Sequence, residues 1–412
     1  MRFIAWQQPN FRRYFVGQVV SSIGSWLQSL AVTWLVLEIT GRGDRLGYAI
    51  ALQFLPLLLF GAQAGVLADK VDNRRLLIAT SAVSAALAVG FGVVVTTGHA
   101  DLWVIYALTF GSGMILAVER PAMQAFVVQL VDADSLTSAV AMNSTIMSGA
   151  RLIGPAVGGV LIATTGIASC FYVNAVSYVV VLAALVGIRR DQLLPRRQRA
   201  GAGGTIRDGL AYVRAHPEVR RPLLVMAVVG TIAINFGTTM PSMVRFTFGG
   251  SAGMVGAAMS LSAIGSIIGG VYVAGLELHP RRTLGFVLLG FAASMFLLAV
   301  SPSYWVFVLI SLGVGFGSTS FQSVDTVVLQ RATEPEMQGR VMALHQMALF
   351  GSTPIGALLM GWIIEATSPR IPFVIGGLSA LGCAAALLVT RRRPEPRPLR
   401  PDIQPLGVAE SG

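Results

Sequence analysis

Charge is scarce in this chain of 412 residues, because Asp, Glu, Lys and Arg together make up only 12% of it. That is about half the share usual in a soluble globular domain. Cysteine is nearly absent too: Cys170 and Cys383 are the only two, and both stand inside apolar runs without other metal-ligating residues nearby. They are expected to be small buried side chains, so we predict no disulfide, no metal site and no cofactor.

Lysine occurs once, at Lys70, where Asp69 precedes it and Val71 follows it. A phosphate-binding loop of the form Gly-x-x-x-x-Gly-Lys-Ser/Thr needs Ser or Thr after its lysine, so this chain has none. A His-Glu-x-x-His zinc signature is missing as well. These absences exclude an ATP-driven pump within this chain and argue against an enzyme.

Apolar sequence is what the chain has in abundance, with a mean hydropathy of +0.71. Runs of about 20 apolar residues are long enough to cross a bilayer. Each half of the chain contains six such runs, at 14–39, 46–68, 76–97, 102–127, 137–163 and 167–188, then 222–245, 252–276, 283–301, 303–329, 339–365 and 371–390. The first run is too long and too rich in Ser and Gln for a signal peptide. The predicted fold is an all-α integral membrane protein with twelve transmembrane helices.

Residues 129–168 recur 202 positions later, in spacing and residue type rather than identity. The glycines Gly149, Gly154 and Gly159, for example, correspond to Gly351, Gly356 and Gly361. A repeat of this length predicts two pseudo-symmetric bundles of six helices. The expected divisions are a first bundle (1–188), a central loop with an amphipathic helix (189–221), a second bundle (222–390) and a disordered cytoplasmic tail (391–412).

Arginine placement predicts the orientation in the membrane. If both termini are cytoplasmic, 24 of the 30 Lys and Arg residues lie in cytoplasmic segments, and only Arg42, Arg45, Arg245 and Arg370 lie outside. This asymmetry follows the positive-inside rule, so we expect a multi-pass protein of the cytoplasmic (inner) membrane. The net charge of +11 would attract anionic lipid. Because the basic residues are scattered over short loops, no nucleic-acid partner is expected.

The segment after the second predicted helix resembles the Gly-x-Leu-Ala-Asp-Arg-x-Gly-Arg-Arg signature of the major facilitator superfamily, with Asp72 where that family usually has glycine. The resemblance implies a gating loop that latches the two bundles on the cytoplasmic side. Asp69 would lie near the N-terminus of the helix that starts around Gly339, a contact worth roughly 0.3–1 kcal/mol. A charge cluster that only sets topology is the alternative. The residues expected in the gating loop are Gly65, Asp69, Lys70, Arg74 and Arg75.

The fifth predicted helix is similar to the Gly-Pro-x-x-Gly-Gly element of antiporter branches of that superfamily. Its residues are Gly154, Pro155, Gly158 and Gly159. Glycines permit close backbone approach and proline bends a helix, so a packing role is expected. The predicted partner surface is Gly265 to Gly269 in the eighth helix, and a role in blocking ion leak or setting export direction stays open. Together with Asn10 to Arg13, the acidic loops and Arg151, the element resembles the enterobactin-exporter-type and related multidrug efflux subgroup.

Buried charges are the costly residues of this sequence, at roughly 2.5–3.5 kcal/mol each on insertion scales. We predict that they form the proton-coupling and intramembrane charge set, which is Glu119, Arg120, Arg151 and Asp325. The first predicted helix has no acidic residue before Glu38, which shifts the expected proton carrier to Glu119 or Asp325. A static ion pair between Glu119 and Arg151, which would only hold two helices together, is the alternative.

Uncharged polar residues predict a substrate cavity along the first, seventh and tenth helices, which line the pathway in the superfamily that the chain resembles. The residues expected there are Gln18, Ser22, Ser25, Trp26, Asn235, Thr238 and Gln322. Small polar residues also serve helix packing, so that interpretation remains beside the first. His345 corresponds to Asn143 in the repeat and is expected either as a hydrogen-bonded packing residue or as a titrating group.

The sequence therefore predicts a secondary active transporter that exports a small amphipathic organic compound, such as a drug, a siderophore or another metabolite. Proton antiport with alternating access is expected, with protons, the small-molecule substrate and the lipid bilayer as partners and a monomer as the working unit. Two intramembrane arginines against one deep glutamate favour neutral or anionic cargo. The alternatives are an uptake symporter or uniporter of a small metabolite, and a membrane receptor or assembly protein without transport activity.

Overall fold

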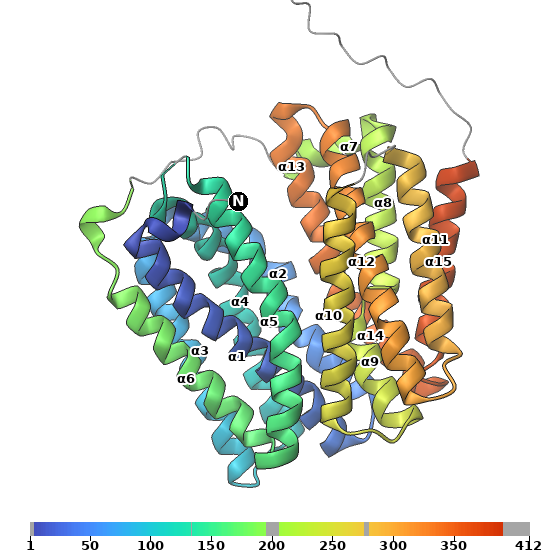
Figure 1. The fold of residues 1–412 in the computed structure, drawn as a ribbon, viewed down its shortest axis with the longest axis horizontal. Helices are drawn as coiled ribbons and strands as arrows, with labels where there is room; N and C mark the ends of the chain where they lie inside the picture. Colours follow the sequence, from blue (N-terminus) through green and yellow to red (C-terminus); the bar gives the residue numbers. More distant parts are fainter. Residues whose placement is uncertain (1–3, 133, 195–205, 276–279, 390–412) are drawn as a thin grey trace, which may run out of the picture.

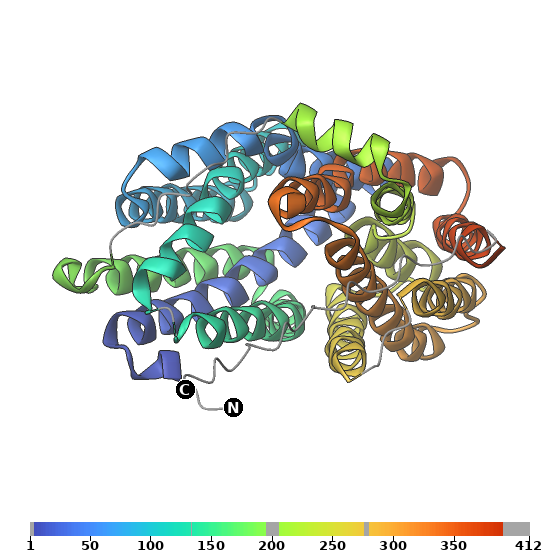
Figure 2. The ribbon, with the colours of Figure 1, turned by 90° about the horizontal axis from the view of Figure 1, so that it is seen from above.

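The computed structural model describes residues 4–132, 134–194, 206–275 and 280–389. The side chains of Ala62, Asp69, Ile206, Pro280 and Arg281 lie outside that description, as do residues 195–205 of the expected central loop and the expected tail 391–412. Within the described residues the regular structure is helical throughout. Two groups of helices stand side by side, coloured blue to green and yellow to red in Figures 1 and 2.

Six long helices form the first bundle. After a short 3-10 turn (Ile4–Gln7) they are α1 (Pro9–Thr40), α2 (Gly43–Lys70), α3 (Asn73–Thr96), α4 (Leu102–Leu130), α5 (Leu136–Thr165) and α6 (Ile167–Val186). The turn between α1 and α2 is very tight. Gly41 makes it possible, because its φ of 60° is left-handed and glycine adopts that conformation without strain. A second 3-10 turn (Arg190–Gln192) follows α6.

The second bundle follows the predicted amphipathic helix, which the structure places at α7 (Ile206–Ala215). Its elements are α8 (Pro217–Ile232), α9 (Phe236–Ser242) with a π-helical turn (Met243–Thr247), α10 (Ala252–Ala274), α11 (Pro280–Ala299), α12 (Tyr304–Ala332), α13 (Pro335–Gln346) with the π-helical turn η4 (Met347–Gly351), α14 (Thr353–Ala366) and α15 (Ile371–Val389).

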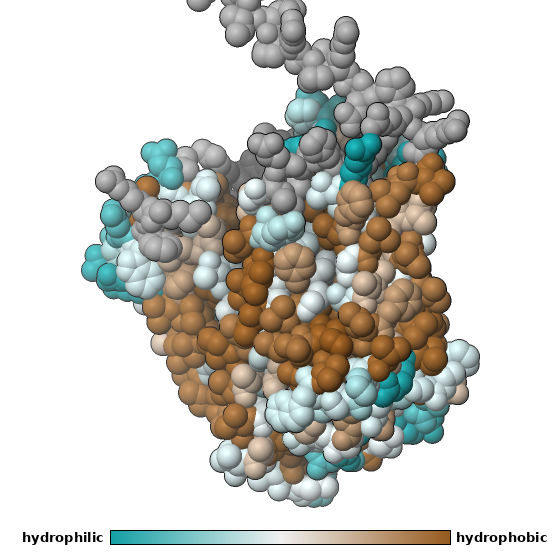
Figure 3. Space-filling model, turned by 45° about the vertical axis from the view of Figure 1, so that its right-hand side comes forward, coloured by the Kyte–Doolittle hydropathy of each residue, from teal (hydrophilic) through white to brown (hydrophobic). Residues whose placement is uncertain are grey.

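The twelve predicted transmembrane crossings are confirmed. Among the described residues, eleven helical segments are long and apolar enough to span a membrane, and α2 with its 28 residues supplies the twelfth. A broad apolar band crosses the middle of the surface in Figure 3, with hydrophilic residues above and below it. Trp103 and Trp305 stand 202 positions apart at the starts of α4 and α12, and their exposed fractions are 73% and 77%. Both positions suit the aromatic belt of a bilayer.

Two crossings that the sequence predicted as continuous helices are interrupted in the structure. The seventh breaks between α8 and α9, where the Asn235 side chain donates to the Thr231 carbonyl at 2.7 Å. An unbroken helix would give that carbonyl to the backbone N–H of Asn235. The eleventh contains η4, and Pro354 explains it, because proline has no N–H and its ring displaces the carbonyl one turn earlier.

The two ends of the molecule differ in which helix termini they hold. We call the end where α1 begins and α7 lies the terminal end, and the end with the α1–α2 turn the far end (Figure 1). The most extensive contacts between the bundles are those of α2 with α14 and of α5 with α10. Most of the described close approaches between them lie toward the far end, and in Figure 1 the bundles diverge toward the terminal end.

Glycines bring the backbones of these two pairs together, and we call this contact the glycine seam. A Cβ atom on Gly361 of α14 would lie only 3.0 Å from the Cα of Gly47 in α2. A Cβ atom on Gly159 of α5 would lie 2.8 Å from the Cα of Gly253 in α10, and one on Gly256 would collide with the Pro155 carbonyl. Because these distances are too short for a side chain, the seam depends on glycine.

The predicted partner surface for α5 was wrong in its residues, although the helix was right. Gly265 and Gly269 of α10 pack against α12, where Cβ atoms would collide with the carbonyl of Leu312 and approach that of Phe316. The surface that meets α5 is nearer the start of α10, and it includes Ser260, whose hydroxyl donates to the Leu152 carbonyl at 2.7 Å. Helix α10 carries small residues on two faces, and residue type alone does not distinguish them.

Replacement of Gly256 by leucine is expected to force α5 and α10 apart. The new side chain meets the Pro155 carbonyl, and overpacking of this kind costs about 1–3 kcal/mol. The measurement is the melting temperature of the purified protein in detergent. Gly290→Leu is the matched control, since a Cβ on Gly290 meets nothing within 4 Å. Equal melting temperatures for the two variants would contradict the account of the seam.

Candidate functional site

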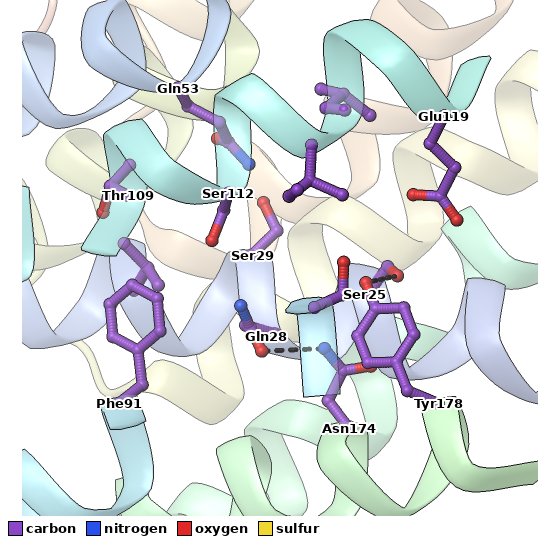
Figure 4. A pocket seen from close by; sticks show the side chains of 14 residues that line it. Ser25, Gln28, Ser29, Gln53, Phe91, Thr109, Ser112, Glu119, Asn174 and Tyr178 are labelled. Atoms are coloured by element: carbon purple, nitrogen blue, oxygen red, sulfur yellow. Dashed lines mark hydrogen bonds between the residues drawn. The ribbon is translucent and has the colours of Figure 1, made fainter. Parts of the chain in front are cut away.

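A polar cavity of about 120 Å³ lies inside the first bundle (Figure 4). Five of the six helices line it, and α5 is the one that does not. The polar lining residues are Ser25, Gln28, Ser29, Gln53, Ser84, Thr109, Ser112, Glu119, Asn174 and Tyr178. All of the residues that line this cavity belong to the first bundle.

Glu119 contributes the one carboxylate among the residues that line the cavity. In Figure 4 its carboxylate faces the end of the cavity where Ser25 and Tyr178 lie, and the hydroxyls of these two residues are 3.3 Å apart. Beside Tyr178, Asn174 donates to the side-chain oxygen of Gln28 at 2.7 Å. The cavity therefore offers hydroxyl and amide groups around a single acid.

The size of this cavity decides what it can hold. A polar cavity of about 120 Å³ has room for several water molecules. Pockets that enclose drug-sized molecules measure about 300–1,000 Å³. The space around Glu119 thus fits water or a small ion and is too small for an amphipathic organic cargo.

The two arginines of the intramembrane charge set rest on aromatic rings. Arg120 lies over Phe350 of the other bundle, with 4.9 Å between the guanidinium carbon and the ring centroid. Arg151 lies over Trp26 of α1 at 5.8 Å. Neither makes an ion pair with a carboxylate among the described residues, so the static Glu119–Arg151 pair is not formed in this structure. Cation–π contacts of this kind are strongest where water is excluded.

Asp325 is paired with a residue that sequence reasoning treated separately. Its carboxylate lies 3.1 Å from Nε2 of His345, and both side chains are almost completely buried in the second bundle. The other carboxylate oxygen of Asp325 and Nδ1 of His345 have no hydrogen-bond partner. His345 also stands immediately before the last residue of α13, so the pair adjoins the π-helical turn η4.

The expected substrate-cavity residues do not gather at one site, but lie on α1, at the break in the seventh crossing and on α12. In α1, Gln18 and Ser22 face α4, because Gln18 contacts both Ser22 and the Met123 sulfur, whereas Ser25 lines the cavity inside the bundle. At the break in the seventh crossing, Asn235 is buried beside Thr238, whose hydroxyl has no partner. On α12 the partly buried Gln322 donates to the Ser318 carbonyl at 3.2 Å.

The expected gating loop is engaged mainly within its own bundle. Arg74 is buried and donates to the carbonyls of Leu185 and Val186, at 2.8 and 2.9 Å, where α6 ends. The side chain of Asp72 accepts from the backbone N–H of Arg75 at 3.1 Å and so caps α3. Lys70 is exposed, Gly65 has open space around it, and the side chain of Asp69 lies outside the described residues.

The four residues of the helix-5 element have a clear packing role. Gly154 and Gly158 face α1, where Cβ atoms would approach Trp26 and Leu30. Pro155 and Gly159 face α10 and form part of the glycine seam. One helix thus contacts its own bundle and the opposite bundle through alternate small residues.

Sequence reasoning missed the cavity residues contributed by α6, which are Asn174 and Tyr178. The signal was present, since both are polar, stand four positions apart within an apolar run and therefore share a helix face. No group of three or more His, Cys, Asp or Glu side chains that could hold a metal ion occurs among the described residues.

The comparisons with known proteins agree with the membrane-spanning fold described above. Residues 2–398 match the family described as transmembrane secretion effector. The staphyloferrin A transporter of Staphylococcus aureus is 27% identical over 374 residues, which are 89% of this chain and 93% of that protein. Macrolide efflux protein A of Streptococcus pyogenes is 22% identical, with 89% and 92% covered. The multidrug efflux pump Tap of Mycobacterium bovis is 24% identical, with 95% and 96% covered.

Solved structures show the same fold. The nucleoside transporter NupG has a TM-score of 0.73 at 12% identity, with 92% of this chain and 98% of that chain covered. A bacterial homologue of the iron transporter ferroportin in an inward-facing state also has a TM-score of 0.73, at 13% identity and the same coverage. The resemblance predicted from the sequence is confirmed: this chain belongs to the transmembrane secretion effector family of major facilitator superfamily transporters.

Proposed function

We propose that this transporter exports a small amphipathic organic compound across the cytoplasmic membrane in exchange for protons. The observation that carries the proposal is the position of Glu119, an acid in a small polar cavity without a basic partner within ion-pair distance among the described residues. Relatives named for siderophore transport, macrolide efflux and multidrug efflux support the export direction.

The orientation that we propose places the terminal end in the cytoplasm, with residues 1–188 and 222–390 as the two bundles of a monomer. The asymmetry of Lys and Arg supports this assignment. In that orientation the glycine seam closes the outer side, and the present state is open toward the cytoplasm. Alternating access then consists of rocking one bundle against the other until the outer side opens.

Proton exchange in this scheme uses the carboxylate of Glu119 as the carrier. With the outer side open, a proton from the medium binds the carboxylate and neutralises it. With the inner side open, the proton leaves to the cytoplasm and the carboxylate is charged again. Because protons move inward down their electrochemical gradient, each cycle can drive cargo outward against its own.

Cargo would bind elsewhere, in the space between the bundles. Arg120 reaches from α4 to Phe350 in the opposite bundle, and Arg151 with Trp26 lies beside the α5 side of the seam. Two cations and two aromatic rings suit an apolar molecule that is neutral or carries negative charge. This division assigns the ion to the first bundle and the cargo to the interface.

An uptake symporter or uniporter is the competing function, and accumulation in cells distinguishes it. Cells with and without the protein are loaded with erythromycin or with staphyloferrin A, and retained compound is measured before and after a protonophore collapses the proton gradient. For at least one of the two probes, the exporter is expected to lower retention, and the protonophore to restore it. A protein-dependent uptake that the protonophore abolishes would instead establish an importer.

Glu119→Gln is expected to abolish proton-driven export, because glutamine has nearly the same shape but cannot take up a proton. Exchange of labelled for unlabelled cargo across proteoliposomes should remain, since it needs no net proton movement. The measurement is export of the transported probe driven by an imposed pH gradient, with Glu218→Gln at an exposed position as the control. Unimpaired gradient-driven export by Glu119→Gln would remove this residue from the mechanism.

Arg151→Ala is expected to lower export by roughly tenfold or more, the loss typical when a hydrogen-bonding charged group is removed from a binding site. Membrane insertion should not change, which surface expression measures independently. The control is Arg331→Ala, whose side chain is exposed at the end of α12. Export equal to wild type would show that Arg151 serves only packing against Trp26.

A further inference from the structure

A polar contact joins the two bundles at the far end of the glycine seam. Glu365 is the second-last residue of α14, and its Oε2 accepts a hydrogen bond of 3.1 Å from the backbone N–H of Gly43. Gly43 is the first residue of α2, in the opposite bundle. This contact therefore forms only while the far end is closed.

Glu365 supplies what the start of α2 lacks. The first N–H groups of a helix have no partner within the helix, and a side chain just before it usually accepts from one of them. The residue in that position is Arg42, which makes no such bond. A carboxylate from the other bundle takes over this role and also meets the positive end of the helix dipole.

Arg42 completes the contact as a bridge between two acids. It donates to both carboxylate oxygens of Asp44, at 3.0 and 2.9 Å, and its Nε lies 3.4 Å from Oε1 of Glu365. The hydrogen bonds to Asp44 raise the pKa of the Arg42 guanidinium, and the charges of Asp44 and Glu365 add to this effect. Arg42 therefore keeps its charge and holds Glu365 in place beside Gly43.

The same two crossings carry a matching acid at the opposite end. Helix α2 and the crossing α13–η4–α14 run antiparallel, and Asp69 is the second-last residue of α2, as Glu365 is of α14. Each acid thus stands where one crossing ends and the other begins. The sequence motif assigns Asp69 to the terminal end, and the structure places Glu365 in contact at the far end.

We propose that Glu365 is the far-end latch of this transporter: its carboxylate caps α2 from the opposite bundle and stabilises the state that is closed at the far end. When the far end opens, Glu365 loses both its hydrogen bond from Gly43 and its contact with Arg42. The inference rests on the rocking motion proposed above, but it concerns residues that take no part in cargo or proton binding.

The latch predicts a shift between two states rather than a loss of folding. A carboxylate at a partly exposed helix start typically changes the ratio of two such states by up to about fivefold. Glu365→Ala removes both the hydrogen-bond acceptor and the charge and should favour the far-end-open state by about that factor. Glu365→Gln keeps an acceptor for Gly43 but not the charge, and should have a smaller effect.

The experiment measures far-end distances in purified full-length protein in lipid nanodiscs. Spin labels are attached to cysteines introduced at His99 and Ser303, two exposed positions in far-end turns of opposite bundles, after Cys170 and Cys383 have been replaced. The expected result is a larger long-distance population in Glu365→Ala than in wild type, with Glu365→Gln between them. Glu38→Gln, exposed at the same end, is the matched control and should behave as wild type.

Two negative outcomes separate the latch from the proposed function. If the wild type shows two populations and Glu365→Ala leaves their ratio unchanged, the latch is wrong and rocking stands. If the wild type and all variants share a single distance at every pH, both ideas fail. Size-exclusion profiles of the labelled variants establish that any change reflects conformation rather than misfolding.

Discussion

Close backbone approach across the glycine seam is the constraint on which the arrangement of the two bundles depends. Side chains are excluded where Gly47 meets Gly361 and where Gly256 meets Pro155, so the helices touch through their main chains. Such a contact can be broken and remade without repacking large side chains. The seam closes one end of the molecule, and the polar contact of Glu365 with the start of α2 lies at its edge.

The charged residues inside the membrane occupy two kinds of position, the interior of a bundle and the interface between the bundles. Glu119 lies in a cavity with room for a few waters, whereas Arg120 and Arg151 rest on aromatic rings. Asp325 and His345 form a second buried acid–base contact in the other bundle. Because a buried charge is costly inside a membrane, we propose that these residues serve transport as well as folding.

Much of this architecture could be predicted from the sequence, because lipid selects apolar runs of a fixed length and the repeat fixes their grouping. The break in the seventh crossing was missed, since it depends on where the side chain of Asn235 places its amide. The break in the eleventh crossing had a signal in the sequence, because Pro354 stands shortly after it. The geometry of the candidate site was harder to predict than the positions of the helices. The spacing of Ser25 along α1 shows that it shares a face with other polar residues, but only packing decides whether that face turns into the bundle or toward its partner. The Asp325–His345 contact joins two helices whose relative rotation no residue pattern specifies.

Alternating access requires that a single path between the bundles is open to one side at a time. Its most direct test is the reaction of a cysteine introduced at Trp26, in a cysteine-free background, with a membrane-impermeant maleimide added from either side. We expect labelling from the terminal-end side in resting vesicles, and from the far-end side once an opposite proton gradient drives the cycle. A cysteine that stays unreactive from both sides, or that reacts equally from both at once, would contradict it.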